Sequence, residues 1–249
     1  MAMSEKMLRA ELLAHRERLT AIGFGGPYTS DLSVRSGDAI LITPEGDQAS
    51  WRPPVIARMP LAGEYGAWKG QQKPSAEWRL HLDIARARPD VGAILRFQSP
   101  YATALAMTRK PIPAAHPAIA LFGGASVRCT PYAPAGTKDL AQLALEALGD
   151  GHAALLGNYG ALTTGATLEA AFARAIELER IAHLYAIALS VGRPAILTDA
   201  EVARVSERLK AAKVKIEDRI SPPAKAKTAA LGAAKAKGAA GKRTARKRV

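Results

Sequence analysis

Arg96 and Gln98 are the first residues whose types and spacing could support chemistry, because they follow an apolar run at 91–95. That run predicts a buried strand, which Ser99-Pro100 ends. Residues two apart on a strand lie on one face. Ligands of open α/β sheets bind beyond the carboxyl ends of the strands. A guanidinium and an amide at such an end could hold a carboxylate or enolate oxygen.

Glu77 is the second candidate, because it follows Pro74-Ser75, a predicted helix start. A glutamate at this place could move a proton to or from a substrate. It could instead stabilise the helix dipole from the first turn and pair with Arg96. His81 lies four residues later on the same helix face. Glu77 and His81 could bind a metal together, or His81 could simply pack in the core.

Short strands that alternate with helices must position these side chains. Apolar periodicity and caps predict helices over 4–19, 76–86, 101–107, 137–148, 167–190 and 199–212, and strands over 31–35, 39–43, 55–59, 91–95, 126–129 and 153–156. The turn at 36–38 joins two strands as a hairpin, which argues against a purely parallel sheet. The sequence therefore predicts an α/β fold.

Several phrases of the chain, in this order and spacing, carry a resemblance to a known family. They are LSVR at 32–35, LITP at 41–44, KPSAEWRLH at 73–81, RPD at 88–90, IPA at 112–114, GG at 123–124, PY at 131–132 and GT at 136–137. Over roughly residues 5–220 the chain resembles the class II aldolase/adducin family, and within it the L-fuculose-phosphate aldolase branch. The resemblance implies a three-layer α/β/α fold with a mostly antiparallel central sheet. It also implies a homotetramer with sites between subunits.

The family's enzymes hold Zn²⁺ with three histidines and cleave a carbon–carbon bond of a sugar phosphate through an enediolate. In this chain the histidine positions fall on Arg96, Gln98 and Tyr159. Zinc requires about three neutral or anionic donors, and a guanidinium stays protonated. We therefore expect no metal and no cofactor at the inherited site. Glu77 remains as the acid/base, Arg96 could be a cation in place of the metal, and Tyr159 could donate a proton or only fill space.

The position of the substrate phosphate in the family has changed as well. The family's Gly-Asn pair falls on Ser30-Asp31, and the small residue of the Thr-Pro-x-Gly turn is Glu45. Ser75 is kept, whereas the serine after it is alanine. Ser30, Asp31, Glu45 and Ser75, together with Gln98, are the predicted substrate-binding residues. Two carboxylates here repel a phosphate dianion. They could form a site for a cation or amine, or be solvated acids of the loops.

Composition separates the chain into a folded part and a basic tail. Of 249 residues, 48% are hydrophobic and 23% are charged, as in a globular protein. No apolar run approaches the roughly 20 residues of a membrane span, and a single cysteine, Cys129, excludes an internal disulfide. We expect a cytoplasmic protein without a membrane partner.

The net charge of +13 lies mainly in residues 222–249, which hold nine lysines and arginines and no acid. Residues 1–221 are predicted to form the aldolase-like domain, and 222–249 a disordered tail. The tail could bind nucleic acid or another polyanion, or it could only improve solubility.

The sequence leads to one main functional hypothesis and to alternatives from other classes. The main hypothesis is a class II aldolase-family protein whose family chemistry is aldehyde-lyase cleavage, here without the zinc site and either inactive or diverged. The first alternative is a metal-free lyase that uses Arg96 and Glu77 on a non-phosphorylated substrate. The second is a scaffold, or a nucleic-acid-associated protein that acts through its tail. Composition and motifs name no substrate.

Overall fold

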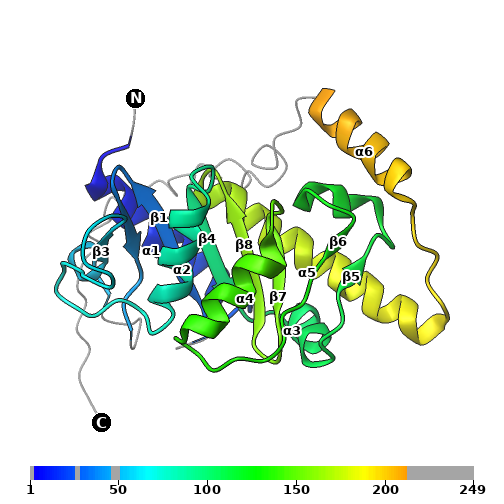
Figure 1. Ribbon diagram of the computed structural model, residues 1–249, viewed down its shortest axis with the longest axis horizontal. Helices are drawn as coiled ribbons and strands as arrows, with labels where there is room; N and C mark the ends of the chain where they lie inside the picture. Colours follow the sequence, from blue (N-terminus) through cyan, green and yellow to red (C-terminus); the bar gives the residue numbers. More distant parts are fainter. Residues whose placement is uncertain (1–2, 26–28, 46–50, 212–249) are drawn as a thin grey trace, which may run out of the picture.

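A six-stranded sheet forms the middle layer of the computed structural model, which describes residues 3–25, 29–45 and 51–211 (Figure 1). The strand order is β3-β2-β1-β4-β8-β7, and each neighbouring pair is antiparallel. The strands are β1 Asp31–Ser36, β2 Ala39–Ile42, β3 Ala57–Pro60, β4 Ala93–Phe97, β7 Ala153–Leu156 and β8 Gly160–Gly165. The expected antiparallel sheet is confirmed.

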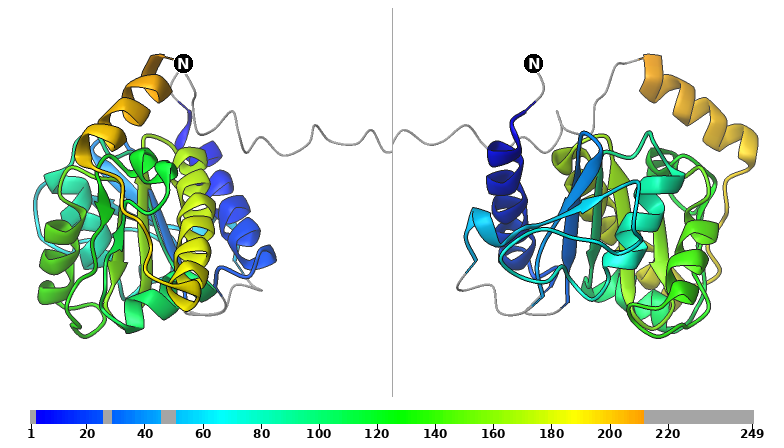
Figure 2. Two further views of the ribbon diagram at one scale, coloured as in Figure 1. Left: turned by 90° about the vertical axis from the view of Figure 1, so that its right-hand side faces the viewer. Right: turned by 60° about the vertical axis from the view of Figure 1, so that its left-hand side comes forward.

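Helices cover both faces of the sheet and complete the three layers (Figures 1 and 2). One face carries α1 (Glu5–Ala21), α3 (Pro100–Met107) and α5 (Leu168–Val191), and the other carries α2 (Trp78–Ala87) and α4 (Lys138–Leu148). A two-stranded sheet of β5 (Ile112–Pro113) and β6 (Ser126–Val127) lies beside α5 (Figure 1). The last helix, α6 (Asp199–Ala211), packs against the 3-10 helix Pro117–Phe122. Across the ranges that the structure describes, no helix combines the length and the apolar character that a membrane crossing requires.

The alternation of side chains along β4 explains how a charged residue enters the core. Leu95 and Phe97 join the apolar cluster under α1 and α5, whereas Ile94 joins the cluster under α2 and α4. Because successive side chains of a strand point to opposite faces, Arg96 lies on the same face as Ile94. The strand therefore presents its guanidinium to the layer that contains α2.

Capping residues set the starts of three helices where the sequence predicts them. Ser4, Thr137 and Thr167 each accept a hydrogen bond from the backbone N–H three residues on, at the starts of α1, α4 and α5. The predicted helix at 76–86 begins later, at Trp78, because residues 75–78 form a turn in which Trp78 N–H donates to Ser75 C=O. Glu77 is thus the N-cap residue of α2, and its placement in the first helical turn was wrong.

Three predicted strands have different bounds in the structure. The strand expected at 91–95 is Ala93–Phe97, so Arg96 belongs to the strand itself. The strand expected at 55–59 is Ala57–Pro60, because Pro53–Val55 forms a 3-10 turn. The strand expected at 126–129 ends at Val127, and Cys129 makes only an isolated bridge to Leu155. Ala212, predicted as the end of the last helix, and the tail at 222–249 lie outside the described residues.

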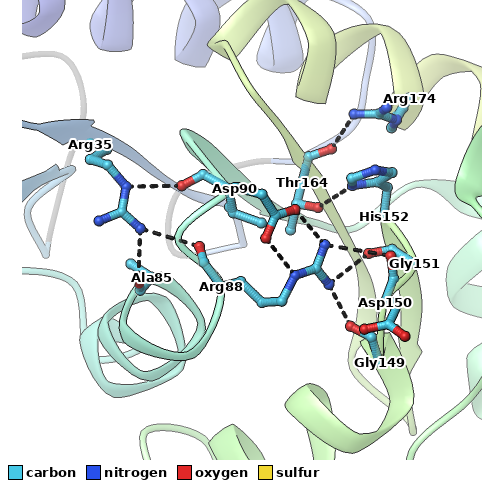
Figure 3. Close-up of polar contacts among 11 residues, drawn as sticks. Arg35, Ala85, Arg88, Asp90, Gly149, Asp150, Gly151, His152, Thr164 and Arg174 are labelled. Atoms are coloured by element: carbon cyan, nitrogen blue, oxygen red, sulfur yellow. Dashed lines mark hydrogen bonds and ion pairs between the residues drawn. The ribbon is translucent and has the colours of Figure 1, made fainter.

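Arginines stabilise the end of the sheet opposite Arg96 by donating to backbone carbonyls (Figure 3). Arg35 at the end of β1 donates to the carbonyls of Ala85, Arg88 and Val91. Arg88 pairs with Asp90 at 2.7 Å and also donates to the carbonyls of Gly149 and Gly151. These bonds join the ends of α2 and α4 to β1, so the arginines of the LSVR phrase at 32–35 and the RPD phrase at 88–90 have a structural role here.

Candidate functional site

A cavity of about 410 Å³ lies at the end of the sheet where β1 begins and β4 ends. All eight residues predicted for the site line it, namely Ser30, Asp31, Glu45, Ser75, Glu77, Arg96, Gln98 and Tyr159. They come from the start of β1, the loop after β2, the start of α2, the end of β4 and the turn between β7 and β8. The first and the last of these residues, Ser30 and Tyr159, are 129 positions apart in the sequence, and the fold brings them to one cavity.

A buried ion pair between Arg96 and Asp31 lines this cavity. Arg96 is 3% exposed and Asp31 is 6% exposed. Both Nε and Nη2 of Arg96 contact Oδ2 of Asp31. The antiparallel register of β1 and β4 places the two residues directly opposite each other. The sequence suggested Glu77 as the partner of Arg96, but the structure gives the ion pair to Asp31 and leaves Glu77 as a charge at longer range.

The carboxylate of Asp31 is engaged on both of its oxygens. Ser75 Oγ donates to Oδ1, and the same Oγ accepts a hydrogen bond from the Glu77 backbone N–H at 3.2 Å. Burial alone would raise the pKa of Asp31, but Arg96 and His81 nearby, together with the Ser75 bond, hold it below its usual range. Asp31 is therefore an ionised group that forms an ion pair with the Arg96 cation.

Glu77 is a buried carboxyl with a different electrostatic setting. It is 3% exposed, and its Oε2 accepts a hydrogen bond from Gly136 N–H at 3.2 Å. Gly136 has φ +70°, and a Cβ there would lie 2.8 Å from the carbonyl oxygen of Ala76, so this contact requires glycine. Burial, reinforced by the charge of Asp31, raises the pKa of Glu77 although Arg96 lowers it. Glu77 is suited to hold a proton and release it.

His81 lies behind the ion pair, within the core of the domain. It is 0% exposed, and its Nδ1 is 2.8 Å from Ser33 Oγ. Its Nε2 has no hydrogen-bond partner among the described residues. His81 does not line the cavity. The geometry is that of a packed helix histidine and not of a Glu77–His81 metal pair.

We predict that His81 makes the fold sensitive to acid. Burial lowers its pKa from 6.5 to about 4. Its contribution to stability is therefore fully present above the pKa of the unfolded chain and is lost as the pH falls toward the folded value. Between these values the free energy of unfolding should fall by about 3 kcal/mol.

Urea titrations of the wild type and of His81→Gln at several pH values measure this effect. The variant keeps a donor for Ser33 but does not titrate, so its unfolding free energy should depend less on pH. His152, whose pKa burial also lowers to about 4, is present in both proteins and cancels in the comparison. Equal pH dependence in the two proteins would mean that His81 has the same pKa in the folded and the unfolded chain, and it would contradict the prediction.

The structure adds residues that sequence reasoning missed, of which Arg16 is the most important. Arg16 of α1 lines the cavity and is 2% exposed. Its Cζ lies 5.9 Å from the ring centroid of Trp51, another missed lining residue. The sequence does contain an indication of this role. Arg16 lies between Leu12 and Leu19 on the apolar face of α1, where a charged residue is unusual and suggests a function. Asn158, with φ +64°, is a further polar lining residue that was not predicted.

The donor groups of the cavity do not fit zinc. The positions that the resemblance assigns to histidines hold a guanidinium bonded to Asp31, the amide of Gln98 and the phenol of Tyr159. Burial and the charge of Glu77 raise the pKa of Tyr159, so the phenol stays protonated. The Tyr159 ring centroid is 5.7 Å from Cζ of Arg96. A fixed cation among the would-be ligands repels a metal ion.

The part of the chain that the structure describes contains no group of three or more His, Cys, Asp or Glu side chains arranged to hold a metal ion.

Comparison with known proteins agrees with this fold. The chain is 42% identical over 204 residues to a 5-methylthioribulose-1-phosphate/5-deoxyribulose-1-phosphate aldolase of Rhodospirillum rubrum, covering 82% of this chain and 91% of that protein. It is 32% identical over 217 residues to an L-fuculose phosphate aldolase of Escherichia coli, covering 87% of this chain and all of that protein. A solved structure of L-fuculose 1-phosphate aldolase superposes with a TM-score of 0.78 at 34% identity, covering 84% of this chain and 98% of that chain.

The model of the family described as class II aldolase and adducin N-terminal domain matches residues 5–186. That match covers most of the chain, and relatives above 30% identity align along nearly their whole length. Its homologues are thus class II aldolases of carbohydrate metabolism. The chain belongs to the class II aldolase and adducin N-terminal domain family.

Proposed function

We propose that this chain is a diverged class II aldolase-family protein that works without zinc and accepts a small, non-phosphorylated molecule in its cavity. One observation carries the proposal: the Arg96 guanidinium, bonded to Asp31, lies where the family resemblance assigns a metal ligand. A cation fixed by the protein supplies positive charge without a metal. The cleavage of sugar phosphates that the family catalyses is then absent, or a different reaction has replaced it.

The chemistry left to the cavity is electrostatic and proton-based. Arg96 can stabilise negative charge that develops on a substrate oxygen. Glu77, whose pKa burial raises, can deliver or take up a proton, and the Tyr159 hydroxyl is a further donor. A phosphate dianion is disfavoured, because Asp31 remains ionised inside the cavity and Glu45 lies exposed among its lining residues. These groups suit a metal-free lyase or a non-catalytic binding protein.

An aldol-cleavage assay tests the proposal directly. The purified chain should cleave neither 5-methylthioribulose 1-phosphate nor L-fuculose 1-phosphate above a protein-free blank, with added Zn²⁺ or with EDTA. The Rhodospirillum relative, assayed in parallel on the substrates in its name, is the positive control. Robust cleavage by this chain that EDTA abolishes would contradict the proposal. Turnover of another substrate that persists in EDTA and disappears in Glu77→Gln would support the metal-free lyase.

Assembly into a homotetramer, which the family resemblance implies, is also part of the proposal. Large apolar side chains are exposed along the second half of α5, namely Leu184, Ile187, Leu189 and Val191. Contiguous exposed apolar surface on a folded protein often marks a contact with another chain. The surface of α5 supports an oligomer and leaves the number of subunits open.

The basic tail supports a second candidate function from another class. Residues 222–249 carry nine cations and no acid, which is the composition of segments that bind polyanions without sequence preference. We expect deletion of 222–249 to lower affinity for duplex DNA at low salt by about tenfold or more, with a shallower salt dependence. Fluorescence anisotropy of labelled DNA measures it. A Gly/Ser tail of equal length is the control, and unchanged DNA binding after deletion would remove this candidate.

A further inference from the structure

Arg16 brings a second guanidinium to the cavity, and the metal-free proposal gives it no role. The side chain comes from α1, on the opposite side of the sheet from α2, and is 2% exposed. Its Nη1 donates to Thr20 Oγ1 at 3.0 Å, and Trp51 lies beside it.

The charge of Arg16 persists at neutral pH. Burial lowers its pKa to about 10, while Asp31 acts in the opposite direction and Arg96 adds to the lowering. Arg16 therefore lies within electrostatic range of the buried ion pair. The inner wall of the cavity carries two guanidinium groups and one ionised carboxylate, Asp31, whose oxygens are taken by Arg96 and Ser75. It also carries the carboxyl of Glu77, whose pKa burial raises. Glu45 is exposed to solvent, where its charge is screened.

Ser30 supplies an independent observation that points to a ligand. Its side chain lines the same cavity and is 3% exposed. Its Oγ finds no hydrogen-bond partner among the described residues. A buried hydroxyl without a partner costs free energy that a bound molecule can recover. Ser30 lines the same cavity as Arg16 and Arg96, so its hydroxyl is available to a molecule that binds between them.

We infer that the cavity binds a small monocarboxylate, an α-hydroxy or α-keto acid, whose carboxylate is held by Arg16 and Ser30. A guanidinium matches the two oxygens of a carboxylate with parallel hydrogen bonds. With Glu77 protonated, one negative charge balances the two guanidinium groups and Asp31, whereas the second charge of a phosphate ester would meet Asp31. The hydroxyl or keto oxygen of the acid would then face Glu77 and Arg96. The volume of about 410 Å³ suits a compact ligand of this class.

This inference rests on the metal-free function proposed above, and its test separates the two. Isothermal titration calorimetry of the full chain in EDTA uses three probes that share a three-carbon frame: glycerate, glycerol 3-phosphate and glycerol. Glycerate should bind at least about tenfold more tightly than either of the others. Arg16→Gln should lower glycerate affinity by about tenfold or more, while Arg193→Gln, the same charge change at an exposed residue outside the cavity, should leave it unchanged.

Should Arg16→Gln fail to fold, Arg16→Lys keeps the charge and loses the paired hydrogen bonds, so it should weaken glycerate binding while remaining folded by circular dichroism. Binding of glycerol but not of glycerate in EDTA would overturn the carboxylate assignment and leave the metal-free function standing. Binding of glycerate only after Zn²⁺ is added would overturn the metal-free function. Tighter binding of glycerol 3-phosphate, or glycerate affinity that is the same in Arg16→Gln, would also overturn the inference.

Discussion

Replacing Arg96 with methionine is expected to lower the free energy of unfolding by about 3–5 kcal/mol. The substitution leaves Asp31 buried, at 6% exposure, without its cation. An uncompensated buried charge is costly because neither water nor a counter-charge solvates it. The Ser75 hydrogen bond to Asp31 remains and recovers only part of the loss. Urea denaturation followed by circular dichroism at neutral pH measures the effect.

Two further variants separate the ion pair from packing. Arg96→Met combined with Asp31→Asn removes both charges, and it should recover most of the stability that Arg96→Met alone loses. Arg180→Met is the surface control, because its ion pair with Glu177 leaves Arg180 46% exposed and should contribute about 1 kcal/mol or less. Equal losses in Arg96→Met and Arg180→Met would mean that the buried pair is energetically unimportant.

Zinc affinity is expected to rise by about a hundredfold or more when the histidine set is rebuilt. The variant carries Arg96→His, Gln98→His and Tyr159→His, with Asp31→Asn so that no carboxylate is left unpaired. The structure supports the design because all four positions and Glu77 line one cavity. Three imidazoles and a carboxylate are a normal zinc ligand set, whereas the native side chains include a fixed cation.

Equilibrium dialysis followed by metal analysis of the protein measures this gain. The same variant with Tyr159 left unchanged is the matched control, since it supplies one ligand fewer and should bind zinc more weakly. No gain in the full variant, with the fold intact by circular dichroism, would show that the cavity does not keep the geometry that the resemblance implies.

Local signals in the sequence were sufficient for much of the fold. The caps at Ser4, Thr137 and Thr167 start their helices as predicted, because an N-cap depends on side chains and backbone within one turn. Strand β8 was not predicted, because Gly160–Gly165 is bounded by glycines and rich in threonine, without a clear apolar period. Its pairing with β4 on one side and β7 on the other, which is long-range, makes it a strand.

The candidate site could likewise be predicted only in part from the sequence. The resemblance identified eight candidate residues, and the structure brings them to one cavity. The partner of Arg96 could not be predicted, because the register of β1 on β4 decides that Asp31 lies opposite it. Arg16 was missed because the helix that carries it approaches the site from the other face of the sheet.

Zinc binding by the unmodified chain tests the central claim most directly. Equilibrium dialysis against Zn²⁺ at neutral pH, followed by metal analysis, should find no zinc whose binding depends on Glu77, Gln98 or Tyr159. The wild type and Glu77→Gln should therefore retain equal amounts of metal. One zinc per wild-type chain that is lost in Glu77→Gln would contradict the account, because it would show that the cavity holds a metal despite the Arg96–Asp31 pair.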